Sequence, residues 1–135
     1  MFGYGNFLLI ATADRLSSRL TLLAVMLETP AAIENADAIA AVDGIDILFI
    51  GTNDLCAQMG IPGNFGHPSV RSAYQRTIAA CRAHGKWAGM GGAYDPDIMA
   101  EHIKGGVQFV LAGSDLSFMM SSASQKSKML SQIER

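Results

Sequence analysis

The sequence predicts an α/β fold with a parallel sheet, because short aliphatic segments alternate with longer segments of helical periodicity. Four segments are too short for buried helices and carry β-branched or aromatic residues, at 22–27, 45–50, 86–90 and 107–112. Such predominantly apolar runs are typical of parallel strands that are buried on both faces. Strand followed by helix, repeated along the chain, indicates β/α units.

The segments between these strands have the signals of helices. The first helix is predicted to start at Thr29-Pro30, because threonine caps helices and proline fits the first helical position. It ends before Gly44, a second helix spans 68–84, a third runs from Asp95-Pro96 to Gly105, and a last one runs from 114 to the C-terminus. A weaker helical segment covers 7–20. The expected core faces are Ile33, Ala36, Ile39 and Ala40 in the first helix, Val70, Tyr74, Ile78 and Cys81 in the second, and Ile98, Met99 and Ile103 in the third.

Chain length limits the architecture to two candidates. A complete (β/α)₈ barrel takes about 250 residues, or roughly 31 per unit. Four units would therefore fill most of this chain of 135 residues, which makes half a barrel the first prediction. A four-stranded doubly wound sheet is the alternative, because it closes its own core. No linker interrupts the pattern, so we expect residues 1–135 to form a single domain.

Composition excludes several classes of protein. Lys and Arg number 10 against 12 Asp and Glu, without a basic cluster, so nucleic-acid binding is not expected. No segment has the apolar length of a membrane span and no signal peptide is evident, so we expect no membrane contact. Cys56 and Cys81 lie far apart in the sequence and are expected to be free thiols. A cytoplasmic globular protein is the resulting expectation.

Acidic residues follow the first two predicted strands. In parallel α/β folds, functional residues gather at the carboxyl ends of the strands. Glu28 follows the first strand and Asp54 the second. A carboxylate at such a place is costly without a compensating partner, and carboxylate oxygens are ligands for divalent cations. The two acids either cap the starts of helices or share a cation, and the spacing alone leaves both hypotheses open.

Glycine-rich turns follow the second and third strands. Gly51 lets a ligand approach the backbone, and the first amides of the next helix, from Leu55 onwards, are unpaired donors. This corner predicts a seat for a carboxylate or phosphate, although a turn without a ligand would look the same. Glycines 89, 91 and 92 do not form a dinucleotide fingerprint, because Tyr94 occupies the place of its last glycine. We expect these glycines to keep the mouth of the site open.

The three histidines do not have the spacing of a metal-ligand cluster. We expect His84 and His102 on helix surfaces. His67 precedes Pro68 and is expected to start a helix, with reach into the site as the second hypothesis.

Three segments resemble the HpcH/HpaI aldolase/citrate lyase family. They are VMLETPAAIENADAIAAVDGIDILFIGTNDL at 25–55, GKWAGMGGAYDPD at 85–97 and FVLAGSDLSFM at 109–119. The similarity runs from about residue 22 to the C-terminus. It implies a TIM barrel of the phosphoenolpyruvate/pyruvate type, of which this chain holds about four β/α units from the C-terminal half.

The resemblance also implies a site and an activity, and it favours the metal hypothesis over capping. Glu28 and Asp54 would ligate a Mg²⁺- or Mn²⁺-type ion. The implied substrate-binding residues are Gly51, Thr52, Asn53, Asp54 and Gly91, with the amides at 52–54 holding the carboxylate of pyruvate. The implied reaction is cleavage of a 4-hydroxy-2-oxo acid to pyruvate and an aldehyde, in which the ion polarises the 2-keto oxygen and stabilises the enolate.

The chain departs from the family pattern at several points. Met26 stands where members often have glutamine, and the metal corner is GTND instead of GPSD or GPAD. The family's proton-transfer histidine and substrate-binding arginine come from the first half of the barrel, and neither Arg15 nor Arg19 matches them. The main expectation is a metal-dependent aldolase acting on a small oxo acid.

Two rival hypotheses and one expectation about assembly complete the prediction. A non-catalytic half-barrel assembly module is the first alternative, and a small doubly wound phosphate-binding domain is the weaker one. The apolar stripe of the last helix, with Leu116, Phe118 and Met119, predicts a homo-oligomer. In the resembled family, the last helix packs on a neighbouring subunit.

Overall fold

The computed structural model describes residues 21–133, which contain one sheet of four parallel strands in the order β1-β2-β3-β4. The strands are β1 (Ala24–Leu27), β2 (Ile47–Gly51), β3 (Trp87–Gly91) and β4 (Phe109–Val110). The helices are α2 (Pro30–Glu34), α3 (Ala36–Ala40), α4 (Thr52–Gln58), α5 (Pro68–Ala83), α6 (Pro96–Gly105) and α7 (Asp115–Ser131). The predicted helix at 7–20, with Arg15 and Arg19, lies outside the described residues.

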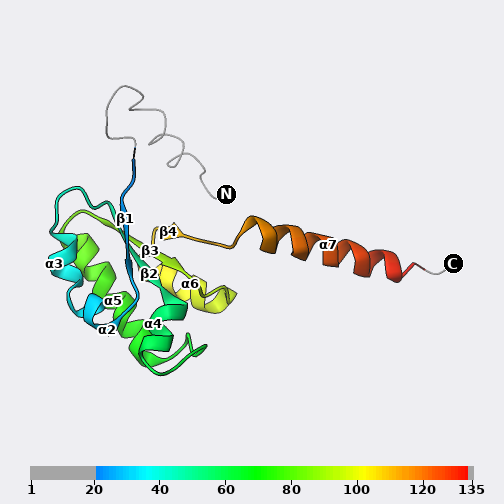
Figure 1. Cartoon of the computed structure of the whole chain (residues 1–135), viewed down its shortest axis with the longest axis horizontal. Coiled ribbons are helices and arrows are strands. Elements are labelled where there is room, and N and C mark those ends of the chain that lie inside the picture. The colour runs from blue at the N-terminus through cyan, green and yellow to red at the C-terminus, as the bar shows by residue number, and fades with distance from the viewer. Residues whose placement is uncertain (1–20, 134–135) are drawn as a thin grey trace.

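The hydrophobic core lies between the helices and one face of the sheet (Figure 1). Strand residues alternate between faces, and Leu27, Leu48 and Met90 belong to the face that packs on the helices. These strand residues contact a helical layer that contains Ile33, Ala36, Ala40, Val70, Tyr74, Ile78 and Cys81. The predicted core faces of the first two long helical segments are therefore confirmed, with Ile39 only partly buried.

The opposite face of the sheet is covered by no helix within residues 21–133. It carries Ile47 and Phe49 of β2, and the ring of Phe49 meets that of Phe109 edge to face at 6.1 Å. Met26 and Leu111 lie on this face at the two edges of the sheet and are 56% and 51% exposed. In a (β/α)₈ barrel this is the interior face, because the helices form only the outer ring.

Strand order and helix placement both contradict the doubly wound alternative. A doubly wound sheet reverses its strand order and carries helices on both faces. Here the order follows the chain from β1 to β4, and the helices that contact the sheet pack on one face. The weaker hypothesis of a small doubly wound phosphate-binding domain is therefore wrong.

Several predicted elements differ in detail. The first helix is broken at Asn35 into α2 and α3, and the Asn35 side chain donates to the carbonyl oxygen of Ala31 at 2.8 Å. The expectation that every strand is buried on both faces holds for the two central strands, β2 and, after Trp87, β3. The edge strands β1 and β4 fail it because, within residues 21–133, no further strand or helix covers them at the edges of the sheet.

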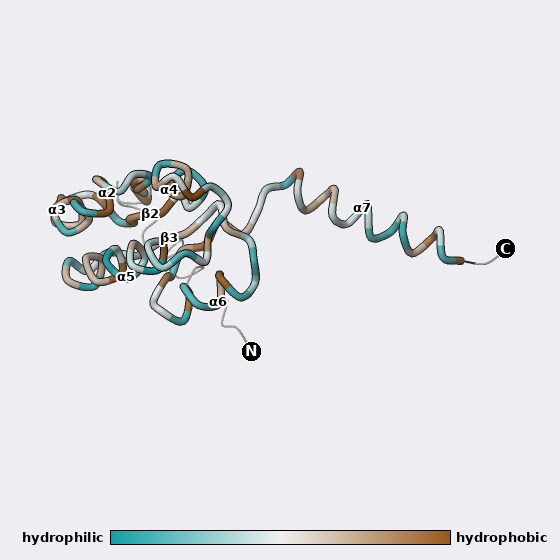
Figure 2. Tube along the Cα trace, turned by 90° about the horizontal axis from the view of Figure 1, so that it is seen from below, coloured by the Kyte–Doolittle hydropathy of each residue, from teal (hydrophilic) through white to brown (hydrophobic). Residues whose placement is uncertain are grey.

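Helix α7 extends away from the rest of the domain as an arm (Figure 1). It contains no buried residue, and hydrophobic turns recur along its length without cover (Figure 2). Its exposed apolar residues are Leu116, Phe118, Met119, Met120, Met129 and Leu130. In the part of the chain from 21 to 133, no helix has the length and hydropathy needed to cross a membrane.

Candidate functional site

The candidate site lies at the carboxyl ends of β1, β2 and β3. The parallel register pairs Leu27 with Ile50 and Gly51 with Gly91, so the residues that follow these strands meet at one edge of the sheet. This edge is where active sites of (β/α)₈ barrels are built.

The carboxylate of Glu28 lies against the backbone of Gly51. A Cβ atom on Gly51 would stand 2.6 Å from Glu28 Oε1 and 2.9 Å from its Cγ. Glycine is therefore required at this point for the Glu28 side chain to occupy its place. The acid of the first strand is thus held at the corner that leads into α4.

Neither acid caps a helix through its side chain. The N-cap of α2 is Thr29, whose hydroxyl accepts from the amide of Ala32 at 3.1 Å. The N-cap of α4 is Gly51, and Asp54 occupies the third position of that helix without a capping hydrogen bond. Asp54 still benefits from the positive end of the helix dipole. Within residues 21–133, neither carboxylate has a hydrogen bond or an ion pair, so neither acid makes a capping hydrogen bond, and Asp54 contributes to a helix start only through the dipole.

Helix α4 begins earlier than predicted. It starts at Thr52, so the amides of its first turn belong to residues 52–54 and not to Leu55 onwards. Gly92 lies over this turn, since a Cβ there would stand 3.1 Å from the Asn53 nitrogen and 3.4 Å from that of Thr52. Its φ of +82° also favours glycine. The backbone of the loop after β3 therefore approaches these amides closely, and a side chain at position 92 would press against them.

Gly91 has a packing role in addition to its place at the site. A Cβ on Gly91 would lie 2.6 Å from Cζ of Phe49, so the glycine makes room for that ring. The same ring lies 2.7 Å from the Cβ position of Gly89. These two glycines are explained by core packing, and Gly92 is the one that keeps the corner open.

The two acids are suitable ligands for a divalent cation. Both offer hard oxygen donors, which Mg²⁺ uses in ones or twos together with waters and substrate oxygens. The glycine at 51 that admits the Glu28 carboxylate is the structural observation that fits such an ion. In the described part of the chain, no group of three or more His, Cys, Asp or Glu residues is arranged to hold a metal. A site here would rely on two carboxylates.

A buried hydroxyl pair links the site to α5, and the sequence analysis missed it. The Thr52 hydroxyl donates to the carbonyl oxygen of Gly91 at 2.7 Å and lies 2.7 Å from the Tyr74 hydroxyl. Because Thr52 uses its single proton toward Gly91, Tyr74 is the donor in the second bond. Burial raises the pKa of Tyr74 to about 12, so this phenol stays protonated at neutral pH. The sequence analysis predicted Tyr74 as a core residue. A buried tyrosine hydroxyl usually needs a hydrogen-bond partner, and that requirement was the only sequence signal for this pair.

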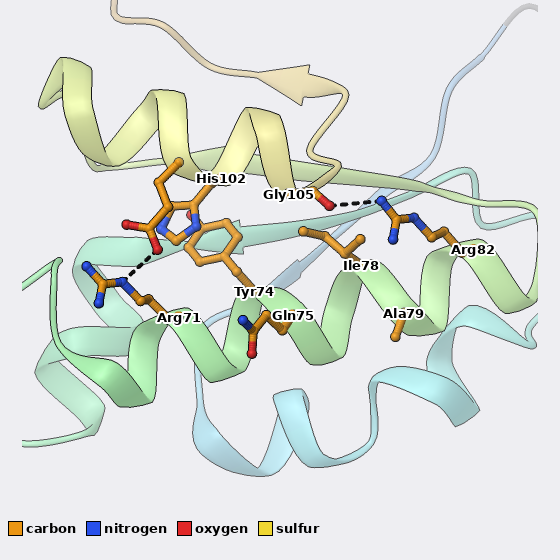
Figure 3. Close-up of a pocket in the computed structure, with 9 residues that line it drawn as sticks. Arg71, Tyr74, Gln75, Ile78, Ala79, Arg82, His102 and Gly105 are labelled. Carbon is orange, nitrogen blue, oxygen red and sulfur yellow. Dashed lines mark hydrogen bonds and ion pairs between the residues drawn. The ribbon is translucent and has the colours of Figure 1, made fainter.

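A groove between α5 and α6 lies on the helical side of the sheet (Figure 3). It encloses about 270 Å³, and Arg71 pairs with Glu101 there at 2.6 Å while Arg82 donates to the carbonyl oxygen of Gly105 at 2.9 Å. The groove does not include Glu28 or Asp54. We therefore do not take it as the site that the strand ends define.

The expectation that His102 lies on the surface of a helix is wrong, because its side chain is buried. It is 4% exposed, and its ring stacks on that of Tyr74 at 3.7 Å (Figure 3). Burial lowers the pKa of His102, and the smaller effects of the neighbouring charges differ in sign: Glu101 raises it and Arg71 lowers it. Ile103, which was predicted to face the core, is 45% exposed instead.

The other two histidines agree better with prediction. His84 is only partly buried and its Nε2 lies 2.9 Å from a carboxylate oxygen of Asp37. His67 is the N-cap of α5, and its Nδ1 accepts from the amide of Ser69 at 3.2 Å. The hypothesis that His67 starts a helix is therefore confirmed.

Comparisons with known proteins agree with this fold. The sequence matches the HpcH/HpaI aldolase/citrate lyase family over residues 9–122. The chain belongs to this family. The match starts earlier than the resemblance noted from about residue 22, and it includes the positions of Arg15 and Arg19.

Curated relatives are longer than this chain. A 4-hydroxy-4-methyl-2-oxoglutarate aldolase of Hapsidospora irregularis is 46% identical over 82 residues, which are 61% of this chain and 29% of the relative. A 5-keto-4-deoxy-D-glucarate aldolase of Enterobacter sp. (strain 638) is 40% identical over 102 residues, covering 76% of this chain and 39% of the relative. The chain spans well under half the length of either relative.

A solved structure has the same partial correspondence. The HpcH/HpaI aldolase/citrate lyase family protein from Burkholderia cenocepacia J2315 superimposes with a TM-score of 0.75 at 26% identity. The match covers 84% of this chain and 44% of that structure. The described residues therefore form part of a TIM-barrel-type aldolase fold, and the prediction of a half-barrel is confirmed.

Proposed function

We propose that this chain is the C-terminal, metal-binding portion of a divalent-metal-dependent aldolase. The observation that carries the proposal is the Glu28 carboxylate, which lies against Gly51 at the start of α4 without a capping or ion-pair partner in the described residues. Residues 1–135 would form one domain of the barrel. A cytoplasmic location stays a prediction from the sequence.

Glu28 and Asp54 would hold a Mg²⁺- or Mn²⁺-type ion. Glu28 directly follows β1 and Asp54 lies in the first turn after β2, and within residues 21–133 no partner competes for their oxygens. The ion would supply Lewis-acid stabilisation of the negative charge that develops on a 2-oxo group. Mg²⁺ is usually bound by one or two carboxylates, so waters and substrate oxygens would complete the coordination of the ion.

The backbone around α4 would bind the oxo acid. The first-turn amides at 52–54 carry no capping side chain and can donate to a carboxylate at the positive end of the helix. Gly51 and Gly91 would line the same corner, and Gly92 leaves space beside the Asn53 amide. Fixed donors of this kind orient the substrate, so that its 2-oxo group faces the two acids.

The proposed reaction is cleavage of a 4-hydroxy-2-oxo acid to pyruvate and an aldehyde. The 4-hydroxyl proton leaves to a base, the C3–C4 bond breaks to release the aldehyde, and its electron pair forms the enolate, which takes up a proton at C3 to become pyruvate. The relatives support this substrate class, since one is named for 4-hydroxy-4-methyl-2-oxoglutarate and another for 5-keto-4-deoxy-D-glucarate. None of the acids or amides at this corner is assigned as that base.

A non-catalytic assembly module is the second candidate. It is favoured by the uncovered interior face of the sheet and by the exposed apolar residues of α7. These same features support a homo-oligomer in either case, because a second copy is an available cover for α7. The two candidates differ in whether the corner binds a metal together with an oxo acid.

Thermal unfolding with metal and oxalate tests the proposal, since oxalate mimics the enolate of pyruvate. A ligand that binds only the folded chain raises the unfolding midpoint, and the stabilisation grows with the logarithm of ligand concentration above Kd. We expect Mn²⁺ plus oxalate to raise the midpoint of the wild type and to have no effect on Glu28→Gln or Asp54→Asn.

Glu34→Gln is the matched control for this experiment, because Glu34 is an exposed acid on α2. It should respond to Mn²⁺ and oxalate like the wild type. A wild-type midpoint that ignores both ligands would favour the assembly module. Turnover of a 4-hydroxy-2-oxo acid that disappears in Glu28→Ala and Asp54→Ala would establish the enzyme.

A further inference from the structure

The Thr52 side chain connects the start of α4 to the end of β3 at the candidate site. Thr52 is the first residue of α4, and Gly91 is the last residue of β3. The bond from Thr52 Oγ1 to the Gly91 carbonyl oxygen spans 39 positions in the sequence and is fully buried. It therefore fixes the start of α4 relative to the loop that carries Gly92.

Tyr74 supplies the second contact that holds this hydroxyl. Its phenol donates to Thr52 Oγ1, and both side chains are about 1% exposed or less. Its ring is held in turn by the stacked ring of His102 (Figure 3). The Thr52 rotamer is thus determined from the α5–α6 side of the sheet, away from the site.

The bond also controls which backbone groups face a ligand. A carbonyl oxygen would repel a bound carboxylate, and the Gly91 oxygen is instead turned toward the buried Thr52 hydroxyl. The loop backbone at Gly92 lies close to the amides of Asn53 and Thr52, since a Cβ there would stand 3.1 and 3.4 Å from their nitrogens. The bond therefore keeps the Gly91 acceptor on the buried side of the corner, beside these amides.

We propose that the Thr52 hydroxyl and Tyr74 are positioning residues that hold the amides at 52–54 in the geometry that binds the carboxylate of an oxo acid. This inference rests on the proposed function and adds to it the part of the molecule that sets affinity for the acid. Neither hydroxyl touches the substrate. Both act through the backbone.

The test is a titration of oxalate at saturating Mn²⁺ with the 135-residue chain and its folded variants. Thr52→Val keeps the shape of the side chain and removes the hydroxyl, and we expect about tenfold weaker oxalate binding, equal to about 1.4 kcal/mol. Thr52→Ser retains the hydroxyl and should bind oxalate within about twofold of the wild type.

Tyr74→Phe removes one hydroxyl and leaves the stacked ring, and it carries the test if Thr52→Val does not fold. We expect roughly threefold weaker oxalate binding, because Thr52 can still donate to Gly91. Since both hydroxyls act through one bond, the double variant should lose little more affinity than Thr52→Val alone.

Thr77→Val is the matched control. Thr77 is 1% exposed on the same helix as Tyr74, and its hydroxyl has no hydrogen-bond partner within residues 21–133. We expect this substitution to leave oxalate binding unchanged. A merely structural role for Thr52 would lower the unfolding midpoint without changing the affinity of the folded molecules.

The outcomes separate the two proposals. Weaker oxalate binding in Thr52→Val and Tyr74→Phe, with recovery in Thr52→Ser, supports the positioning role. Wild-type affinity in folded Thr52→Val or Tyr74→Phe overturns that role and leaves the proposed function intact. A wild type that binds no oxalate with Mn²⁺ overturns the proposed function, and the positioning role with it.

Discussion

Gly51 is the residue on which the arrangement of the candidate metal ligands depends most directly. Gly51→Ala would place a methyl group 2.6 Å from Oε1 of Glu28 and 2.9 Å from its Cγ, so the carboxylate must move. We expect Mn²⁺ affinity to fall by about tenfold, the effect of losing about 1.4 kcal/mol of binding. Titration of Mn²⁺ against the folded variant measures the change.

Gly66→Ala is the control for that substitution. Gly66 lies in the loop before α5, and nothing stands within 4 Å of its Cβ position. This variant should bind Mn²⁺ like the wild type. Equal affinity in Gly51→Ala would mean that the Glu28 carboxylate is not a ligand in the position that it occupies here.

His102 gives the protein a stability that depends on pH. Its folded-state pKa is lowered from 6.5 by burial, so below that value the unfolded chain binds the proton more readily than the folded one. The free energy of unfolding should therefore fall as the pH drops through about 6.5. Urea unfolding at about pH 7.5 and about pH 5.5 measures this loss.

His102→Phe separates this contribution from the other titrating groups. It removes the ionisable ring and preserves an aromatic ring against Tyr74. We expect the variant to lose less stability than the wild type over the same pH interval. His84 and Asp37 are present in both proteins, so their contribution cancels. An equal loss in the two proteins would show that His102 does not carry the effect.

In α6, the spacing of apolar residues did not predict correctly which residue is buried. The apolar pattern predicted Ile103 toward the core, but His102 takes that place. The aromatic face of Tyr74 on α5 stacks on the imidazole, and this contact is not encoded in the local sequence of α6. An apolar pattern can therefore misplace the buried side of a helix by one residue. This happens when an aromatic side chain of another element packs on a neighbouring polar residue.

At the scale of elements, the caps that the sequence contains decide where helices start. Thr29, His67, Asp95 and Ser114 each accept hydrogen bonds from the first turn of the helix that follows. The predicted starts of α2, α5, α6 and α7 were accordingly close to those in the structure. The start of α4 was missed by three residues because Gly51 is its N-cap and offers no side chain as a signal.

Helix α7 is expected to depend on association with another copy of the chain. It has 17 residues and buries none, whereas helices in proteins owe most of their stability to tertiary packing. We expect the amides at 115–131 to exchange rapidly in dilute solution and to become protected as the concentration rises. Hydrogen exchange followed by mass spectrometry at several concentrations measures this difference.

The amides of α5 provide the internal reference, because that helix is packed in the core. Their protection should not depend on concentration. Slow exchange of α7 in a sample that sedimentation identifies as monomeric would contradict the expectation, since the helix would then be stable by itself.

At the scale of the whole molecule, no helix within residues 21–133 covers the interior face of the sheet, and Met26 and Leu111 at its edges are exposed. A strand face and sheet edges without cover favour pairing with another chain. We expect the chain to self-associate in solution, and light scattering should give a mass above that of one chain of 14.3 kDa. Met26→Lys, at the exposed edge of this face, should weaken the association.

Val42→Lys is the control for Met26→Lys. Val42 is 51% exposed, close to the 56% of Met26, but it lies outside the strands. This variant should associate like the wild type. A wild-type chain that remains monomeric at high concentration would mean that the half-barrel is stable with its interior face open.

The sequence by itself determined the alternation of strands and helices, because alternation depends on local periodicity and on caps. It also identified Glu28 and Asp54 as residues at strand ends. Only the tertiary structure decided that the strands follow chain order, that no helix within residues 21–133 covers one face of the sheet, and that the Glu28 carboxylate lies against Gly51. The bonds of Thr52 to Tyr74 and Gly91 span 22 and 39 positions. Such contacts depend on how segments that are distant in the sequence pack together, so local sequence patterns do not predict them.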